Sequence, residues 1–215
     1  RYSLLMMHKT ETPPEYHPYR KSYPVPSDPQ TPFTITYKVK KGKAGYQNSW
    51  GVAICSIGGD TIYWARVIES NTTRDIPTTQ YQIPVDVLRD NKCREIVFFL
   101  VPNGGNNGLS SGQSISFSRS APGWKNSASV EDDWVFFVNP DMNPDRTNKV
   151  KYNGNHEQWW EDLHGPNSDE DYDDFKVTYR VGFLASEYDF EGIECYVYDR
   201  PKPEALLIDI LVRDQ

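Results

Sequence analysis

The stretch WGVAICSIGGDTIYWARVI, residues 50–68, predicts a β-hairpin and with it the fold class of the chain. Two runs rich in β-branched and aromatic residues, Trp50–Ser56 and Thr61–Ile68, flank the turn-forming residues Gly58–Asp60. Runs of this kind on either side of a short glycine-containing turn are typical of two antiparallel strands. The stretch therefore indicates antiparallel β-structure rather than helices.

The same kind of sequence pattern continues on both sides of the hairpin. Short β-rich runs bounded by Gly, Asn, Asp and Pro recur along the chain, and no amphipathic helix longer than about two turns stands out. The continuously apolar run EIVFFLV predicts a strand buried on both faces. The other predicted strands are Phe33–Val39, Tyr81–Val87, Ser114–Arg119, Trp134–Val138, Phe175–Leu184, Glu194–Asp199 and Leu206–Val212, with Val85–Arg89 as an alternative helical turn. We predict an all-β fold, a β-sandwich or jelly-roll-like domain with long loops.

Residues 1–32 differ from the rest of the chain because they are rich in proline, which removes backbone donors and fixes φ. They predict an extended N-terminal arm, followed by a single β-sandwich domain over residues 33–215. The arm is a linker or a tail lying on the surface, and an alternative is that Tyr2–Met7 pairs with a sheet edge. The chain holds no apolar run of about 18 residues and only three cysteines, which argues against a membrane span and against a disulfide framework.

The most unusual composition lies between Lys151 and Lys176, which enclose eight acidic residues and no lysine or arginine. The other 22 of the 30 acidic residues nearly balance the 23 Lys and Arg, so the net charge of −7 comes from this acidic segment. Like charges this close repel unless a cation or several hydrogen-bond donors lie among them. The net negative charge of the chain also argues against nucleic acid as a partner.

Alternating acids favour calcium, which takes six to eight oxygen ligands from carboxylates, carbonyls and water. Composition alone favours a solvated acidic loop, but the flanking aromatics Trp159, Trp160, Tyr172 and Phe175 predict that the segment is anchored to a core, where unpaired charge is costly. The segment is no EF-hand, and His156 lacks the second histidine of a zinc protease helix. The predicted Ca²⁺ ligands are Glu161, Asp162, Asp169, Asp171, Asp173 and Asp174.

Four other residues are candidates for binding or modification. Asn103 and Asn106, in the loop PNGGNNG, either contact a ligand or simply form turns, and the turn is favoured. Trp124, in the polar stretch APGWKNS, is a candidate surface platform for a sugar, whereas Trp134 is expected in the core. Asn71 begins an Asn-Thr-Thr sequon and is a glycosylation candidate, although such triplets often arise by chance.

Several of these stretches resemble one bacterial domain family. WEDL at 160–163 followed by a turn and DEDYDD at 169–174 is similar to its FEDL…D-x-D-[FY]-N-D signature, with Asp173 in place of the usual Asn. AGYQNSWG at 44–51, FLVPNGG at 99–105 and WVFFVNP at 134–140 add to a resemblance that covers roughly residues 33–184. The family was first catalogued as a domain of unknown function (4114) and occurs in large calcium-dependent RTX-type adhesins. The resemblance implies a β-sandwich, calcium in the ligand site, and a carbohydrate or peptide ligand on a cell surface.

The leading functional prediction is thus an extracellular or cell-surface calcium-dependent binding module without enzymatic activity. The alternative is a structural subunit of an extracellular filament, in which the arm or Leu206–Val212 completes a neighbour's sheet by strand addition. A third possibility is a polysaccharide-active enzyme on a jelly-roll scaffold, for which residues 131–133 would supply a second carboxylate.

Overall fold

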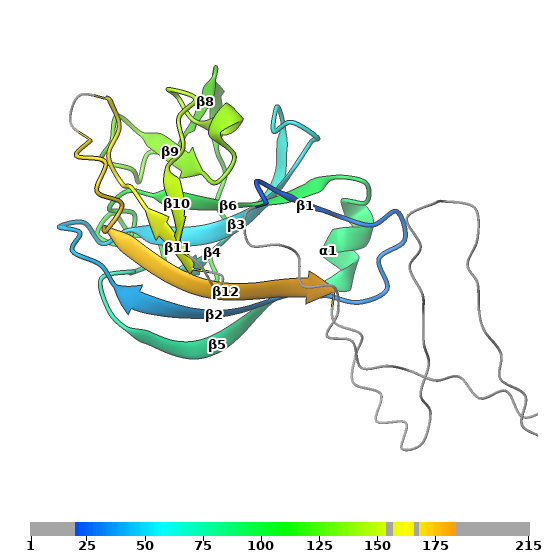
Figure 1. The fold of residues 1–215 in the computed structure, drawn as a ribbon. Helices are drawn as coiled ribbons and strands as arrows, with labels where there is room; N and C mark the ends of the chain where they lie inside the picture. Colours follow the sequence, from blue (N-terminus) through cyan, green and yellow to red (C-terminus); the bar gives the residue numbers. More distant parts are fainter. Residues whose placement is uncertain (1–19, 154–156, 166–167, 184–215) are drawn as a thin grey trace, which may run out of the picture.

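The computed structural model describes residues 20–153, 157–165 and 168–183. Two antiparallel sheets pack face to face as a sandwich, and the short helix α1 (Val85–Asp90) lies at one end of it (Figure 1). The acidic segment, coloured yellow to orange, lies at the opposite end. The predicted all-β sandwich is confirmed.

The first sheet has seven strands in the order β4-β3-β6-β9-β8-β7, with β1 also paired to β6. Its strands are β1 (Tyr23–Pro24), β3 (Ser49–Cys55), β4 (Ile62–Glu69), β6 (Glu95–Val101), β7 (Ser118–Ser120), β8 (Gly123–Lys125) and β9 (Trp134–Phe137). The second sheet has five strands in the order β10-β11-β12-β2-β5. Its strands are β2 (Phe33–Lys41), β5 (Ile76–Ile83), β10 (Val150–Asn153), β11 (Glu157–Trp160) and β12 (Phe175–Phe183), and one 3-10 turn, η1 (Pro140–Met142), follows β9.

Strand β6 is buried on both faces, as its apolar sequence predicts. Phe98 and Leu100 face the second sheet, whereas Val97 and Phe99 pack into a second cluster beneath β8 and β9. β6 pairs along its whole length with β3, which is also fully buried. The hairpin from β3 to β4 is confirmed, and its turn needs Gly58 and Gly59 because both have φ above +80°.

The second sheet is buried on one face only. In β2 and β12, alternate residues enter the core between the sheets, and the residues between them point outward. Tyr23 of β1 also enters this core: its hydroxyl lies 3.1 Å from that of Tyr179, and its ring packs edge-on against Phe98. Part of the predicted arm, from Tyr23 to Val25, therefore packs into the domain core.

Some predicted elements differ from the structure. A continuous strand over residues 114–119 is wrong: Ser114 forms only an isolated bridge to Arg66, and β7 begins at Ser118. The extended stretch predicted at residues 81–87 instead divides at Pro84 into β5 and α1, which supports the helical alternative. The predicted segments Tyr2–Met7, Glu194–Asp199 and Leu206–Val212 lie outside the described residues. In the described part of the chain, helices are too short and too polar to cross a membrane.

Candidate functional site

The two ends of the acidic segment meet because β11 and β12 form an antiparallel pair. Trp160, the last residue of β11, is the cross-strand partner of Phe175, the first residue of β12. Both side chains are fully buried and their ring centroids lie 6.4 Å apart. This anchor places Glu161 and Asp162, which leave β11, beside Asp174, which leads into β12.

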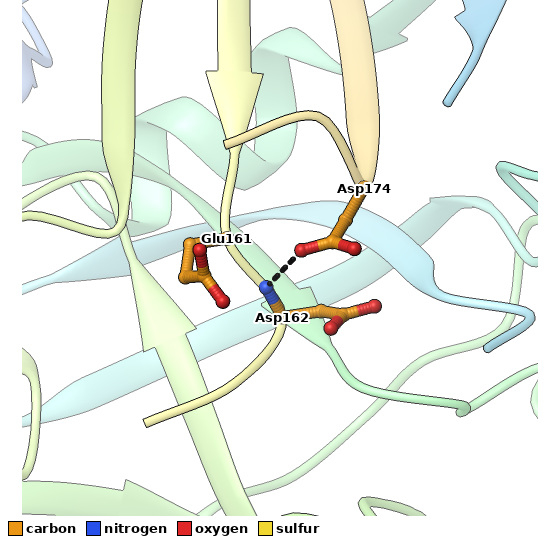
Figure 2. A group of neighbouring side chains, drawn as sticks. All are labelled: Glu161, Asp162 and Asp174. Atoms are coloured by element: carbon orange, nitrogen blue, oxygen red, sulfur yellow. Dashed lines mark hydrogen bonds between the residues drawn. The ribbon is translucent and has the colours of Figure 1, made fainter. Parts of the chain in front are cut away.

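Three carboxylates converge at this point. Glu161, Asp162 and Asp174 each have an oxygen that lies within 4.8 Å of an oxygen of the other two. Figure 2 shows the arrangement, in which the backbone N–H of Asp162 donates to Asp174 Oδ2 at 3.0 Å. Glu161 is only 1% exposed and Asp162 only 3%. The chain therefore buries negative charge where an exposed loop would leave it in water.

Only one of the two carboxylate oxygens of Glu161 accepts a hydrogen bond within the described residues. Its Oε1 accepts a long bond of 3.3 Å from the backbone N–H of Leu163. Its Oε2 is buried and makes no hydrogen bond within the described residues. No lysine, arginine or histidine in the described part of the chain forms an ion pair with Glu161, Asp162 or Asp174. A buried carboxylate oxygen without a partner is costly unless the group is protonated or a cation lies against it.

The electrostatics of the cluster follow from this burial. Burial raises the pKa of Glu161 to about 7, and the neighbouring Asp174 carboxylate adds to the effect. Burial likewise raises the pKa of Asp162, with further repulsion from Asp174. A divalent cation among these groups would replace repulsion by attraction and return the carboxyls to their ionised state.

The irregular stretch at residues 169–174 brings three more acids to the same cluster, Asp169, Asp171 and Asp173. Glu170 and Tyr172 adopt left-handed conformations, with φ of +54° and +57°. Between them, Asp171 accepts from the N–H of Asp173 at 3.0 Å. One oxygen each of Glu161, Asp169 and Asp171 lie within 4.8 Å of one another, and the same holds for one oxygen each of Asp171, Asp173 and Asp174.

All six predicted ligands therefore belong to one connected cluster, because the three groups share Glu161, Asp171 and Asp174. The cluster is buried at Glu161 and exposed at Asp169 and Asp171. Asp173 differs from the others because Lys43 forms an ion pair with it and keeps its pKa low. Clustered carboxylates, carbonyls and access to water are what Ca²⁺ coordination requires.

The aromatic anchors are confirmed with one exception. Trp160, Tyr172 and Phe175 are buried beside the acids. Trp159 is half-buried and points to the outer face of the second sheet, because neighbouring residues of β11 alternate between the two faces.

Asn48 is a site residue that the sequence analysis missed. It is fully buried just before β3, and its Nδ2 donates to Asp162 Oδ2 at 2.6 Å. Its Oδ1 accepts from the N–H of Asn103 at 3.0 Å. Asn48 thus connects the acidic cluster to the loop PNGGNNG, although 114 residues separate it from Asp162. In the sequence, the only indication of this role was that Asn48 is a polar residue directly before a largely apolar strand.

The loop itself supports the turn interpretation. The side-chain oxygen of Asn103 accepts from the N–H of Gln47 at 3.0 Å and from Asn106 Nδ2 at 2.8 Å. Asn103 has φ of +56°, a conformation that asparagine tolerates better than most residues. Its side chain is used within the protein, whereas Asn106 is exposed and its contact with a ligand stays a prediction.

We expect Asn48→Ala to lower the free energy of unfolding by about 2 kcal/mol or more, because the buried Asp162 carboxylate and the half-buried N–H of Asn103 each lose their hydrogen bond to Asn48. It should also weaken binding of any cation, since Asp162 loses the bond that orients it. Urea unfolding measures the first effect. Asn106→Ala, at the exposed end of the same network, should change stability by less than about 0.5 kcal/mol. Equal effects from the two substitutions would contradict the role of Asn48.

Two other sequence candidates lie elsewhere. The prediction that Trp124 forms a surface platform is wrong: it is 5% exposed because β8 packs into the second core cluster. Trp134, expected in the core, is only half-buried, and Lys125 Nζ lies 4.5 Å from its ring centroid. Asn71 is half-buried, and its side-chain oxygen accepts from the hydroxyl of Thr73 at 2.7 Å. Glycosylation of Asn71 stays a prediction.

Comparison with known proteins gives one finding. Residues 91–181 match the model of a family described as a domain of unknown function (DUF4114). The matched part contains all six acids of the cluster and supports the predicted domain family, whereas Asn48 lies before it. No curated protein and no solved structure gives a significant match to the chain.

Proposed function

We propose that this protein is a calcium-binding module that presents the bound ion to a carbohydrate or peptide ligand outside the cell or at its surface. The observation that carries the proposal is the buried Glu161 Oε2, which has no hydrogen-bond partner in the described residues and lies beside two further carboxylates. Exposed acidic loops do not bury their charges in this way, so a solvated loop is the weaker explanation.

Calcium suits the cluster better than magnesium does. Six carboxylates on a short loop offer many oxygens in irregular geometry, which Ca²⁺ accepts, whereas Mg²⁺ demands near-octahedral coordination and keeps several waters. The left-handed residues Glu170 and Tyr172 keep the acids close together despite their repulsion. A bound cation would offset the free-energy cost of holding the loop in that conformation, because it attracts carboxylates that otherwise repel one another.

The ligand would bind on the exposed side of the ion. Glu161 and Asp162 hold the ion from the protein interior, and Asp169 and Asp171 face solvent. An ion held from one side retains coordination positions for ligand oxygens, either vicinal hydroxyls or a carboxylate. The filament and enzyme alternatives gain no specific support from the described residues.

Calorimetric titration with CaCl₂ tests the metal site. We expect the wild-type chain to bind calcium and the double variant Glu161→Gln/Asp162→Asn to bind it at least about 100-fold more weakly, because two ligands to the ion are lost. The matched control is Asp86→Asn/Asp90→Asn, which removes the same charge from the exposed face of α1. Equal affinities in the two double variants would reduce calcium binding to a general charge effect and refute the site.

A further inference from the structure

The outer face of the second sheet carries an ordered set of cationic residues. The strand register places Lys40 opposite Lys176, Lys176 opposite Trp159, and Trp159 opposite Lys151. These residues form one row across four neighbouring strands, β2, β12, β11 and β10. Since neighbouring strands lie about 4.8 Å apart, the row spans about 14 Å.

A second and a third row continue the face. The second row consists of Lys38, Thr178, Glu157 and Asn153, and the third of Gln80, Thr36 and Arg180. The exposed surface ends at Thr34 and Gly182, which are buried. Apart from Trp159, the three rows contain only charged, hydroxyl and amide side chains.

Folding stability does not account for this arrangement. Lys40 and Lys176 are direct cross-strand partners, and like charges in such positions are destabilising. Among the described residues, Lys38, Lys40, Lys151 and Lys176 form no ion pair with a carboxylate. The protein carries a net charge of −7, so these lysines are not a consequence of a generally basic composition.

Two aromatic rings hold part of the row in place. Lys176 Nζ lies 4.1 Å from the ring centroid of Trp159, and Lys151 Nζ lies 3.8 Å from that of Tyr172. The indole N–H of Trp159 donates to Glu157, which fixes the orientation of the ring. The row is therefore a partly preorganised surface rather than a set of freely moving lysines.

We propose that this outer face binds a linear anionic polysaccharide, one that carries carboxylate or sulfate groups. The lysines would contact the anionic groups, and the threonine, glutamine and asparagine side chains would bond the sugar hydroxyls. Trp159 offers an apolar surface for the carbon–hydrogen face of a sugar ring. A row that spans about 14 Å across four strands fits an extended chain rather than a compact anion.

The same features argue against two other occupants. A second copy of the chain offers its acidic segment, but among the described acids of that segment only Asp169, Glu170 and Asp171 are exposed, and three neighbouring residues cover less than the three rows. A nucleic acid would carry a phosphate on every unit, whereas the second and third rows hold one cationic residue each, Lys38 and Arg180, and the second row also holds the carboxylate of Glu157. This binding surface contains none of the six clustered acids and does not need calcium, although Tyr172 of the acidic segment packs against Lys151.

The test is binding of the full chain to immobilised heparin and polygalacturonate in the presence of a chelator, so that failure of the calcium proposal cannot affect it. Neutral dextran and a single-stranded DNA oligonucleotide are the comparison ligands. The variant is Lys40→Ser/Lys176→Ser. The control, Lys21→Ser/Lys92→Ser, makes the same charge change at exposed positions outside this face. Thermal melting verifies that both variants fold.

We expect one or both anionic polysaccharides to bind, dextran not to bind, and affinity to fall as NaCl rises. The Lys40/Lys176 variant should bind about tenfold more weakly, and the control within about twofold of wild type. Equal weakening in the two variants, or binding to neither polysaccharide, would overturn the proposal. Tighter binding to DNA would assign the face to nucleic acid, and loss of self-association in the variant without polysaccharide binding would assign it to a second copy.

Discussion

Replacing Glu161 by glutamine is expected to stabilise the protein in a chelator and to destabilise it in calcium. Without a cation, the folded state holds the Glu161 carboxylate in a buried position where its Oε2 makes no hydrogen bond within the described residues. Glutamine removes the charge at nearly constant volume. With calcium, the same substitution removes a ligand to the ion, so the stabilising effect of calcium is lost.

The expected sizes follow from linkage. Burial raises the pKa of Glu161 from 4.5 to about 7, which corresponds to about 3 kcal/mol at pH 8. The amide also needs partners, so we expect a gain of about 1–3 kcal/mol in chelator. Calcium at about 100 times its dissociation constant stabilises the wild type by nearly 3 kcal/mol, and most of this is lost in the variant.

The pH dependence has a definite sign. A carboxyl whose folded pKa is raised binds more protons in the folded state, so stability falls as pH rises from the unfolded pKa to the folded pKa. In chelator, the advantage of Glu161→Gln should therefore be largest near pH 8 and small near pH 5. Urea unfolding at both pH values measures it, with Glu170→Gln as an exposed control from the same loop. A variant that lowers stability equally in chelator and calcium would show that Glu161 has only a structural role.

The sequence was sufficient for the main features of the sandwich. The apolar run in β6 and the glycines at 58–59 each determine one structure through local physics, a buried strand and a tight turn. Strand β11 was missed because its four residues lie within the acidic segment, where Trp159 and Trp160 suggested core anchors. Their alternation becomes clear only when β12 pairs alongside.

The sequence was enough to predict which acids form the cluster, but not which of them are buried. The sequence does not distinguish buried Glu161 from exposed Asp169, because burial depends on the packing of β11 against the rest of the sandwich. The partners Lys43 and Asn48 come from the β2–β3 connection, more than 100 residues away, and no local pattern announces them. The prediction that Trp124 lies at the surface failed because it was based on the polar residues around it in the sequence. In the structure, β8 places the Trp124 ring in the second core cluster.

The β2–β3 connection also holds the acidic segment by direct backbone contact. The N–H of Lys43 donates to the carbonyl of Asp173 at 2.9 Å. A Cβ added at Gly42 would lie 2.1 Å from the carbonyl oxygen of Asp174 and 2.5 Å from that of Asp173. Both atoms are backbone, so the clash is not relieved by rotating a side chain. Only glycine permits this approach, and the approach sets the position of Asp174.

Gly42→Ala is accordingly expected to lower the free energy of unfolding by about 3 kcal/mol, at the upper end of what overpacking costs, and to abolish calcium binding. The two effects are connected, since the nearest clashing atom is the carbonyl oxygen of Asp174 and relieving the clash by a shift of the loop displaces Asp174 relative to Glu161 and Asp162. Thermal melting with and without calcium measures both.

Gly45→Ala is the matched control, because it lies in the same connection and a Cβ there would meet no atom within 4 Å. It should leave the melting temperature and calcium affinity within error of wild type, or raise the former slightly by reducing the freedom of the unfolded chain. If Gly42→Ala behaves like Gly45→Ala, the backbone contact does not position the acids. If Gly42→Ala lowers stability but keeps wild-type calcium affinity, Asp174 is not a ligand and the ion is held by the remaining carboxylates.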